Sequence, residues 1–121
     1  MLPQVARLTR PEDFRRTIRG GRSARRLTVI VYGSMTAGGT PDQATRAGVT
    51  VSKAVGGSVV RHRVARVIRH ELRTQLSEAP PGSTWVVRAL PAAGAQGVGR
   101  SLAQDVASAF HEVLSSQGAQ T

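Results

Sequence analysis

The residues with the clearest chemical potential are the cations between positions 53 and 73. This stretch holds one lysine and five arginines against a single acid, Glu71. A guanidinium group is planar, can hold two phosphate oxygens at once and can also stack on a base. The segment therefore predicts binding of a polyanion, and its expected contact residues are Lys53, Arg61, His62, Arg63, Arg66, Arg69 and Arg73.

The candidate groups for protein catalysis do not form a recognisable set. The three histidines, His62, His70 and His111, are scattered, and the seven acids are dispersed along the chain. Their predicted positions combine no histidine with a carboxylate as an acid–base pair, and the serines lie in no nucleophile motif. The chain has no cysteine, which excludes thiol nucleophiles and thiolate metal sites. We expect no catalytic residue and no metal site built from protein side chains alone.

The net charge of the chain points to the same kind of partner. The 121 residues carry a formal charge of +10, and the residues outside positions 1–26 and 53–73 are close to neutral. Such an imbalance costs self-repulsion and is typical of a protein with a polyanionic partner. Neither cluster has the bulky apolar face of a membrane-surface helix, and no apolar run reaches the roughly 20 residues of a membrane span. Nucleic acid is favoured over membrane, and the lack of cysteine fits the cytoplasm.

The elements that must position these cations are expected to form one domain over residues 1–121, with a basic N-terminal segment (1–10) and a frayed tail (115–121). Thr9 and Glu12 have the spacing of a capping box, which predicts a short helix over 11–19. Runs of β-branched residues predict strands over 27–32, 47–51 and 85–90, and a short edge strand over 21–25. Longer helices are predicted over 59–76, with Ser58 as its cap, and over 101–114.

The order helix, strands, helix, strand, helix predicts an α+β fold, organised as an α/β sandwich. Three helices are expected to pack on a small mixed sheet of about four strands that is mainly antiparallel. The helix over 59–76 should place its apolar side on this sheet, because its valines share one sector at about 100° per residue. The opposite side then carries an arginine stripe: His62, Arg66, Arg69 and Arg73, with Arg61 and Arg63 at the boundary.

This stripe favours RNA over two other interpretations. Like charges four residues apart destabilise a free helix, so a stripe of one sign is more than a solvated face. A helix that reads DNA usually mixes arginine with the Asn, Gln or Ser side chains that contact base edges, and the outward face has none. Duplex RNA is recognised through its shape, phosphates and 2′-hydroxyls. The loop with Lys53, Gly56 and Gly57 precedes a helix N-terminus, and it is open whether it binds an anion or only starts the helix.

The order of residues from Gly48 to Arg69 has a close counterpart in a known family. Gly48-Val49-Thr50-Val51-Ser52-Lys53, then Gly56, then Val59-Val60-Arg61-His62-Arg63-Val64-Ala65-Arg66-Val67-Ile68-Arg69 resembles the signature of the bacterial ribonuclease P protein subunit. In that family a strand ends in Ser-x-Lys, a glycine turn follows, and the helix opens with Arg-Asn-Arg-x-Lys-Arg-x-x-Arg. The resemblance runs from about Leu2 to Phe110, and it includes Arg7-Leu8, Glu12-Asp13-Phe14, Gly21 and Tyr32.

The resemblance implies a function. The protein would assist a catalytic RNA subunit in the endonucleolytic removal of the 5′ leader from precursor tRNA, with hydrolysis performed by the RNA and its Mg²⁺. One monomeric protein would bind each RNA through the arginine helix and its preceding loop. The leader would bind in a cleft between the first helix and the sheet, near Phe14, Tyr32 and Lys53. The resemblance also implies a left-handed β-α-β crossover, although general rules favour a right-handed one.

Two residues depart from the family pattern, and other functions remain open. His62 stands where the family has Asn, and Ala65 stands where it has Lys, which removes one charge. Ile18 occupies a position where the family often has a second aromatic residue. Phe14 is open to a purely structural interpretation as a core residue. The alternative function is a non-catalytic structured-RNA-binding protein of ribosomal or RNA-chaperone type, and a third is a small DNA-binding regulator.

Overall fold

The computed structural model describes residues 10–35, 45–95 and 97–118 of the chain. Its elements follow one another as α1 (Pro11–Gly20), β1 (Arg22–Arg25), β2 (Val29–Ser34), β3 (Arg46–Thr50), α2 (Ser58–Gln75), β4 (Thr84–Ala89) and α3 (Gly99–Gly118). Two 3₁₀ turns, η2 (Leu76–Glu78) and η3 (Pro91–Gly94), lie on either side of β4. The predicted order of helices and strands, and with it the α+β class, is confirmed.

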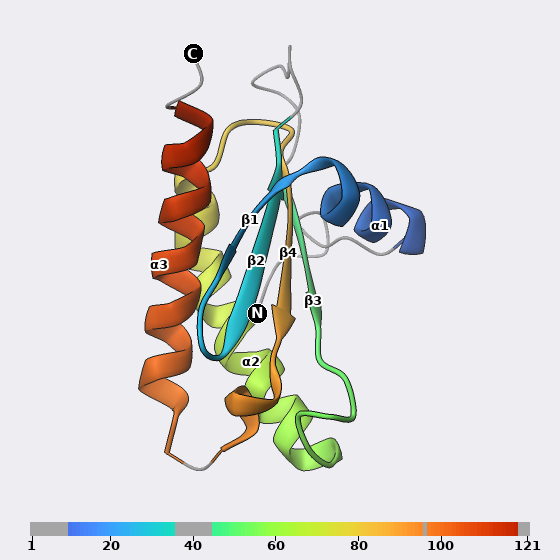
Figure 1. The fold of residues 1–121 in the computed structure, drawn as a ribbon, viewed down its shortest axis with the longest axis vertical. Helices are drawn as coiled ribbons and strands as arrows, with labels where there is room; N and C mark the ends of the chain where they lie inside the picture. Colours follow the sequence, from blue (N-terminus) through green and yellow to red (C-terminus); the bar gives the residue numbers. More distant parts are fainter. Residues whose placement is uncertain (1–9, 36–44, 96, 119–121) are drawn as a thin grey trace.

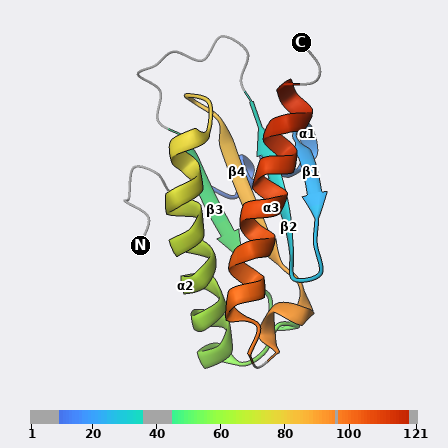
Figure 2. The same ribbon diagram turned by 90° about the vertical axis from the view of Figure 1, so that its left-hand side faces the viewer.

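The four strands form one mixed sheet in the order β1-β2-β4-β3. Neighbours β1 and β2, and β2 and β4, are antiparallel, whereas β3 and β4 are parallel. Helix α2 connects the parallel pair. In Figure 2, α2 lies in front of the sheet, β3 and β4 run downwards and β4 lies to the right of β3, which is a left-handed crossover. The handedness implied by the resemblance is the one observed, against the general preference.

The helices divide between the two faces of the sheet. Helices α2 and α3 cover one face side by side, and α1 packs across part of the other (Figures 1 and 2). The side chains of β4 alternate between these two faces. Trp85 and Val87 belong to the core beneath α2 and α3, and Val86 and Arg88 point to the face on which α1 lies. One face of the sheet is thus fully covered, and the other is only partly covered.

The core has an aromatic pair at its centre. Trp85 on β4 and Phe110 on α3 are both fully buried and stack with their ring centroids 3.9 Å apart. The indole N–H of Trp85 donates to Ser83 Oγ at 2.9 Å, and Ser83 Oγ donates to the Pro80 carbonyl at 2.7 Å. The one polar atom of this pair is therefore satisfied inside the core. The stack ties α3 to the central strand of the sheet.

Polar contacts hold the β1–β2 hairpin against α3. Asp105 on α3 accepts hydrogen bonds from both the backbone N–H and the hydroxyl of Thr28, at 3.2 and 2.6 Å. Arg26 donates to Glu112 at 2.9 Å and to Ser108 Oγ at 3.1 Å. These bonds fix the hairpin, and they explain why Arg26 belongs to the fold rather than to an open basic surface.

The ends of the elements differ from the predictions in three ways. Arg10 and Gly57 are the N-cap residues of α1 and α2, and neither helix has a side-chain cap, so Ser58 begins α2 instead of capping it. Thr9 lies outside the described residues. Helix α3 runs to Gly118, past the predicted end at Leu114, because no helix breaker precedes that glycine. The predicted N-terminal segment (1–10) lies outside the described residues except for Arg10, whereas residues 115–118 of the predicted frayed tail (115–121) are helical and only 119–121 lie outside.

The strands are displaced by one or two residues from their predicted bounds. Strand β2 was predicted over 27–32 and is observed at Val29–Ser34, because Leu27 and Thr28 form the turn that follows β1. Pairing with β4 extends β2 to Gly33 and Ser34, which pair with Trp85 and Thr84. Within the described parts of the chain, no helix is long and apolar enough to cross a membrane.

Candidate RNA interface

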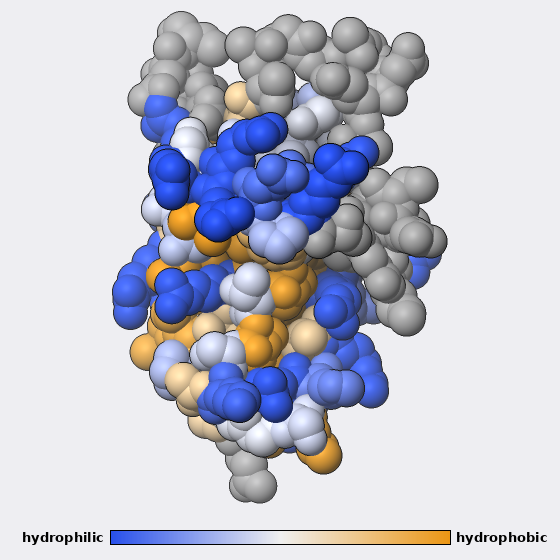
Figure 3. Space-filling view, turned by 90° about the vertical axis from the view of Figure 1, so that its right-hand side faces the viewer, coloured by the Kyte–Doolittle hydropathy of each residue, from blue (hydrophilic) through white to orange (hydrophobic). Residues whose placement is uncertain are grey.

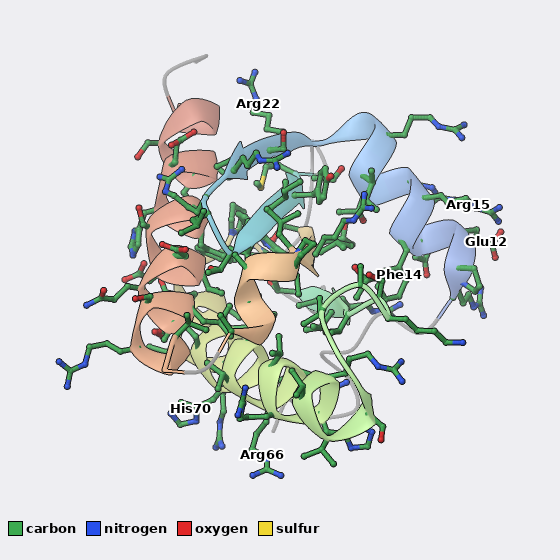
Figure 4. The ribbon with its side chains drawn as sticks, turned by 60° about the horizontal axis from the view of Figure 1, so that its bottom comes forward. Glu12, Phe14, Arg15, Arg22, Arg66 and His70 are labelled. Atoms are coloured by element: carbon green, nitrogen blue, oxygen red, sulfur yellow. The ribbon has the colours of Figure 1, made fainter. Side chains whose placement is uncertain are left out.

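Helix α2 carries its arginines on the side away from the sheet. Its buried residues are Val64, Ile68, Leu72 and Gln75, which recur at helical spacing. His62, Arg63, Arg66 and Arg73 are exposed, and Arg69 is half-buried. Figure 4 shows Arg66 and His70 pointing outward from α2. The phasing predicted from the sequence is confirmed, since one side of the helix is core and the other is cationic.

The cations of this stripe form no ion pair that stabilises the described part of the fold. Among the described residues, the ion pairs are Arg26–Glu112 and His111–Glu78, and neither includes a residue of α2. A shallow hollow lies between His62, Ala65, Arg66 and Arg69. The small side chain of Ala65, which replaces the lysine of the family pattern, forms part of its floor. The surface thus combines arginines that form no ion pair among the described residues with a shallow depression.

Arg61 differs from the other arginines of the set. It is half-buried, and its Nε atom is buried without a hydrogen-bond partner among the described residues. Its position follows from the helical spacing, because Arg61 lies three and seven residues before the buried Val64 and Ile68. The sequence placed it at the boundary of the stripe, and the structure places it on the inner side of that boundary.

The turn that carries Lys53 is held by local contacts. Val55 N–H donates to the Ser52 carbonyl at 3.1 Å, and Gly56 N–H donates to the Lys53 carbonyl at 3.2 Å. Gly56 has a φ of 156°, which only glycine adopts without strain. Lys53 itself is exposed between the end of β3 and the start of α2. It thus lies in the turn that joins the edge strand β3 to α2; its assignment to both predicted RNA sites stays a prediction.

Phe14 packs against the sheet on the side opposite α2, with the far end of its ring at Gly48. It is half-buried, and a Cβ atom at Gly48 on β3 would overlap its ring. Its helix is held to the sheet by Thr17, whose Oγ1 lies 2.8 Å from both the Asp13 carbonyl and Thr84 Oγ1. Gly48 thereby creates the space in which the aromatic ring rests on the sheet. The ring has a packing role and also keeps part of its surface open.

Tyr32 lies in the same row of the sheet as Gly48. The register pairs Tyr32 with Val86, and Val86 with Gly48, so two strand spacings of about 4.8 Å separate the positions of Tyr32 and Gly48. Tyr32 is half-buried, whereas Val86 between them is fully buried. The structure therefore brings Phe14 and Tyr32 to one face, on either side of an apolar floor. This face is shown in Figure 3, where an apolar band lies between groups of hydrophilic side chains.

The next row of this face contains residues that the sequence interpretation missed. Ile30, Arg88 and Thr50 are paired across β2, β4 and β3, and Arg88 is exposed. The signal available in the sequence was the single charge at Arg88 in the otherwise apolar strand 84–89. A charged residue at an alternating position marks the open face of a sheet. The row adds a cation and an apolar side chain beside the aromatic one.

The remaining titratable groups form no further centre. His62 and His70 are exposed on α2, and His111 on α3 is exposed, with its Nε2 3.5 Å from Glu78 Oε2. In the described ranges, no three His, Cys, Asp or Glu side chains are grouped so that they could hold a metal ion.

Comparison with known proteins gives the family of the chain. The family model for ribonuclease P matches residues 2–113. The ribonuclease P protein component of Streptomyces avermitilis is 46% identical, over 94% of this chain and 96% of that protein. The corresponding protein of Corynebacterium diphtheriae is also 46% identical, over 77% of this chain and 81% of that protein.

Solved structures agree in fold. The ribonuclease P protein of Staphylococcus aureus superimposes on this chain with a TM-score of 0.70 at 22% identity. The superposition covers 91% of this chain and 93% of the Staphylococcus aureus chain. The protein of Thermotoga maritima superimposes with a TM-score of 0.67 at 18% identity, over 84% and 92% of the two chains. The family match, which spans nearly the whole chain, and the shared α+β fold lead to one conclusion: the chain belongs to the ribonuclease P protein family.

Proposed function

We propose that this protein serves ribonuclease P through two separate RNA surfaces, one for the catalytic RNA and one for the substrate. Membership of the family makes the chain a protein subunit that assists removal of the 5′ leader from precursor tRNA. The finer assignment is ours. The α2 stripe with Lys53 binds the catalytic RNA, and the face with Phe14 and Tyr32 binds the leader.

The observation that supports this division is the placement of the two surfaces on opposite sides of one sheet. The α2 stripe belongs to the covered face and is entirely cationic, which suits the phosphates of a folded RNA. The face of α1 offers half-buried aromatic rings beside an exposed arginine, which suits unstacked bases of a single strand. A folded RNA presents mainly phosphates, which match the α2 stripe, and a single-stranded leader presents unstacked bases, which match the aromatic face.

The proposal assigns bond cleavage to the RNA subunit. The described side chains include no acid–base pair in a cleft and no metal-binding group of three, so the protein residues do not fit a Mg²⁺ site by themselves. We therefore assign Mg²⁺ mainly to the RNA. The protein contributes charge neutralisation and substrate contacts, as one monomer per RNA, and we place this assembly in the cytoplasm.

A cleavage assay tests the function. Precursor tRNA is incubated with the cognate catalytic RNA at low Mg²⁺, with and without the protein, and the release of the 5′ leader is followed. The protein is expected to accelerate cleavage and to favour leader-bearing over leaderless tRNA in binding. If neither changes, the chain acts instead as a general structured-RNA-binding protein of ribosomal or RNA-chaperone type. A preference for a specific DNA duplex at fixed salt would point to a DNA regulator.

Replacing Phe14 by alanine is expected to weaken binding of leader-bearing tRNA by roughly 5- to 100-fold, because stacking of one base on an aromatic ring contributes about 1–3 kcal/mol. The measurement is the affinity of the assembled complex for precursor tRNA and for mature tRNA. Phe14→Leu is the matched control, since it keeps an apolar side chain over Gly48 but removes the ring. Unchanged leader preference in both variants would show that Phe14 only packs on the sheet.

A further inference from the structure

Helix α1 has a second cationic face that the two surfaces above do not use. Phe14 and Thr17 point to the sheet, and at 100° per residue Arg15, Arg16 and Arg19 lie on the opposite side of the helix. All three arginines are exposed. Figure 4 shows Arg15 and Glu12 pointing outward from α1, away from the sheet. We call Arg15, Arg16 and Arg19 the α1 arginine face.

The fold does not account for this face. No ion pair or side-chain hydrogen bond of the three arginines occurs among the described residues. Glu12 lines a shallow surface hollow together with them, and Asp13 lies three residues before Arg16, so two acids leave part of the positive charge unbalanced. By contrast, Arg26 in the same half of the chain is bound to Glu112 and Ser108. A group of like charges on a ten-residue helix opposes helix formation. Its presence therefore calls for an anionic partner.

The position of α1 favours the leader of the precursor tRNA over the catalytic RNA as the anionic partner of the α1 arginine face. Helices α1 and α2 lie on opposite faces of the sheet, and Arg15 and Arg66 point in different directions (Figures 1 and 4), so the α1 arginine face is separate from the α2 stripe. The open face with Phe14 and Tyr32 lies directly beside α1 and shares Phe14 with it. A single strand that leaves this face over α1 meets the three arginines next.

We propose that the α1 arginine face binds phosphates of the distal part of the leader, beyond the nucleotides that contact Phe14 and Tyr32. This inference rests on the leader-binding role proposed for the open face. An α-helix is about 10–12 Å across with its side chains, so a flexible strand passes from the aromatic side of α1 to its arginine side within a few nucleotides. The protein then favours long leaders over short ones, whatever their sequence.

The test compares precursor tRNAs with leaders of about 4 and about 16 nucleotides, which bracket the usual site sizes for single strands on a small domain. Affinity for the complex of the protein with its catalytic RNA is measured over a range of salt concentrations. For the wild type, the long leader is expected to bind more tightly and with a steeper salt dependence. In Arg15→Ala/Arg16→Ala/Arg19→Ala, long-leader affinity should fall by roughly ten- to a hundredfold at about 0.1 M salt, with a loss of about 2 in the log–log slope. Short-leader affinity should stay at the wild-type value.

A variant of opposite sign separates the proposal from a defect in folding. Alanine is the strongest helix former, so the triple variant should keep α1. Glu12→Gln removes the acid that lines the same hollow as the arginines and should strengthen long-leader binding by about twofold, with no effect on the short leader. Equal loss for both leaders, or a length advantage that survives in the triple variant, would overturn the proposal. Equal affinity of the wild-type complex for the long and the short leader would also overturn the proposal. A wild-type complex that binds leader-bearing and leaderless tRNA equally would instead overturn the proposed function of the open face.

Discussion

Replacing Arg66 and Arg69 together by alanine is expected to weaken binding of the catalytic RNA by about 30-fold at roughly 0.1 M monovalent salt. Both side chains lie on the outward side of α2, where no described acid pairs with them. Each phosphate contact contributes about 0.7–0.9 to the slope of log affinity against log salt, so the slope should flatten by about 1.4–1.8. The measurement is a set of binding titrations at several salt concentrations, without substrate.

The matched control for this variant is Arg22→Ala/Arg25→Ala on β1. It removes the same charge from the opposite edge of the sheet, because β1 and β3 are the two edge strands and α2 follows β3. Figure 4 shows Arg22 far from Arg66. The control should change affinity much less than the α2 variant. Equal losses in the two variants would mean that net charge alone drives binding and that the α2 stripe has no special role.

Replacing Phe110 by alanine is expected to cost about 3–5 kcal/mol of the free energy of unfolding. The ring is fully buried and stacks on Trp85 at a centroid distance of 3.9 Å, so its removal leaves a cavity between α3 and the central strand β4. For a domain of this size, such a loss lowers the melting temperature by on the order of 10–20 °C. Urea denaturation and thermal unfolding both measure the effect.

Leu27→Ala serves as the control for Phe110→Ala. Leu27 is 80% exposed at the tip of the β1–β2 hairpin, so its truncation should change stability by less than about 0.5 kcal/mol. A similar small change for Phe110→Ala would mean that the aromatic stack does not hold α3 on the sheet. Since both RNA surfaces are built on this sheet, the Phe110 variant should bind RNA normally only in conditions where it remains folded.

Much of the arginine stripe on α2, the proposed RNA surface, could be predicted because its positions depend on residues close together in the sequence. The positions of Val64, Ile68 and Leu72 follow from helical spacing, and the same spacing places Arg66 and Arg69 on the other side. A helix that has only one apolar side has only one way to pack on a sheet. The charge of the chain, the arginine stripe and the order of elements therefore followed from residues close together in the sequence.

The face with Phe14 and Tyr32 depends on contacts between distant residues. The family resemblance named both residues, but their relation is set by the pairing of Tyr32 with Val86 and of Val86 with Gly48. A shift of one residue in either register would turn one of these side chains to the other face. The charge of Arg88 marked the open face of its strand, but only the pairing of Arg88 with Ile30 and Thr50 places it beside the row of Tyr32 and Gly48.

The helix ends show a smaller effect of the same kind. Serine is a residue type that often caps helices, but Ser58 is the first residue of α2 and Gly57 is its N-cap. The turn from Lys53 to Gly57 sets where the helix starts. Strand β2 extends to Ser34 because β4 offers a partner there, although the local sequence ends its β-branched run earlier. Pairing partners decide where a strand ends, and local propensity only suggests it.

By itself, the sequence predicted a polyanionic partner and an arginine stripe on one helix as its main contact, and its motif resembled that of the ribonuclease P protein family, to which the chain belongs. Charge and helical periodicity carry the first two predictions, and the motif from Gly48 to Arg69 carries the resemblance; all three depend on residues close together in the sequence. The tertiary structure alone decided that α1 and α2 lie on opposite faces of the sheet and that Phe14 rests on Gly48 beside an open, partly aromatic surface. Strand register and layer packing join residues far apart in the chain, so the separation of the two RNA surfaces is visible only in the folded molecule.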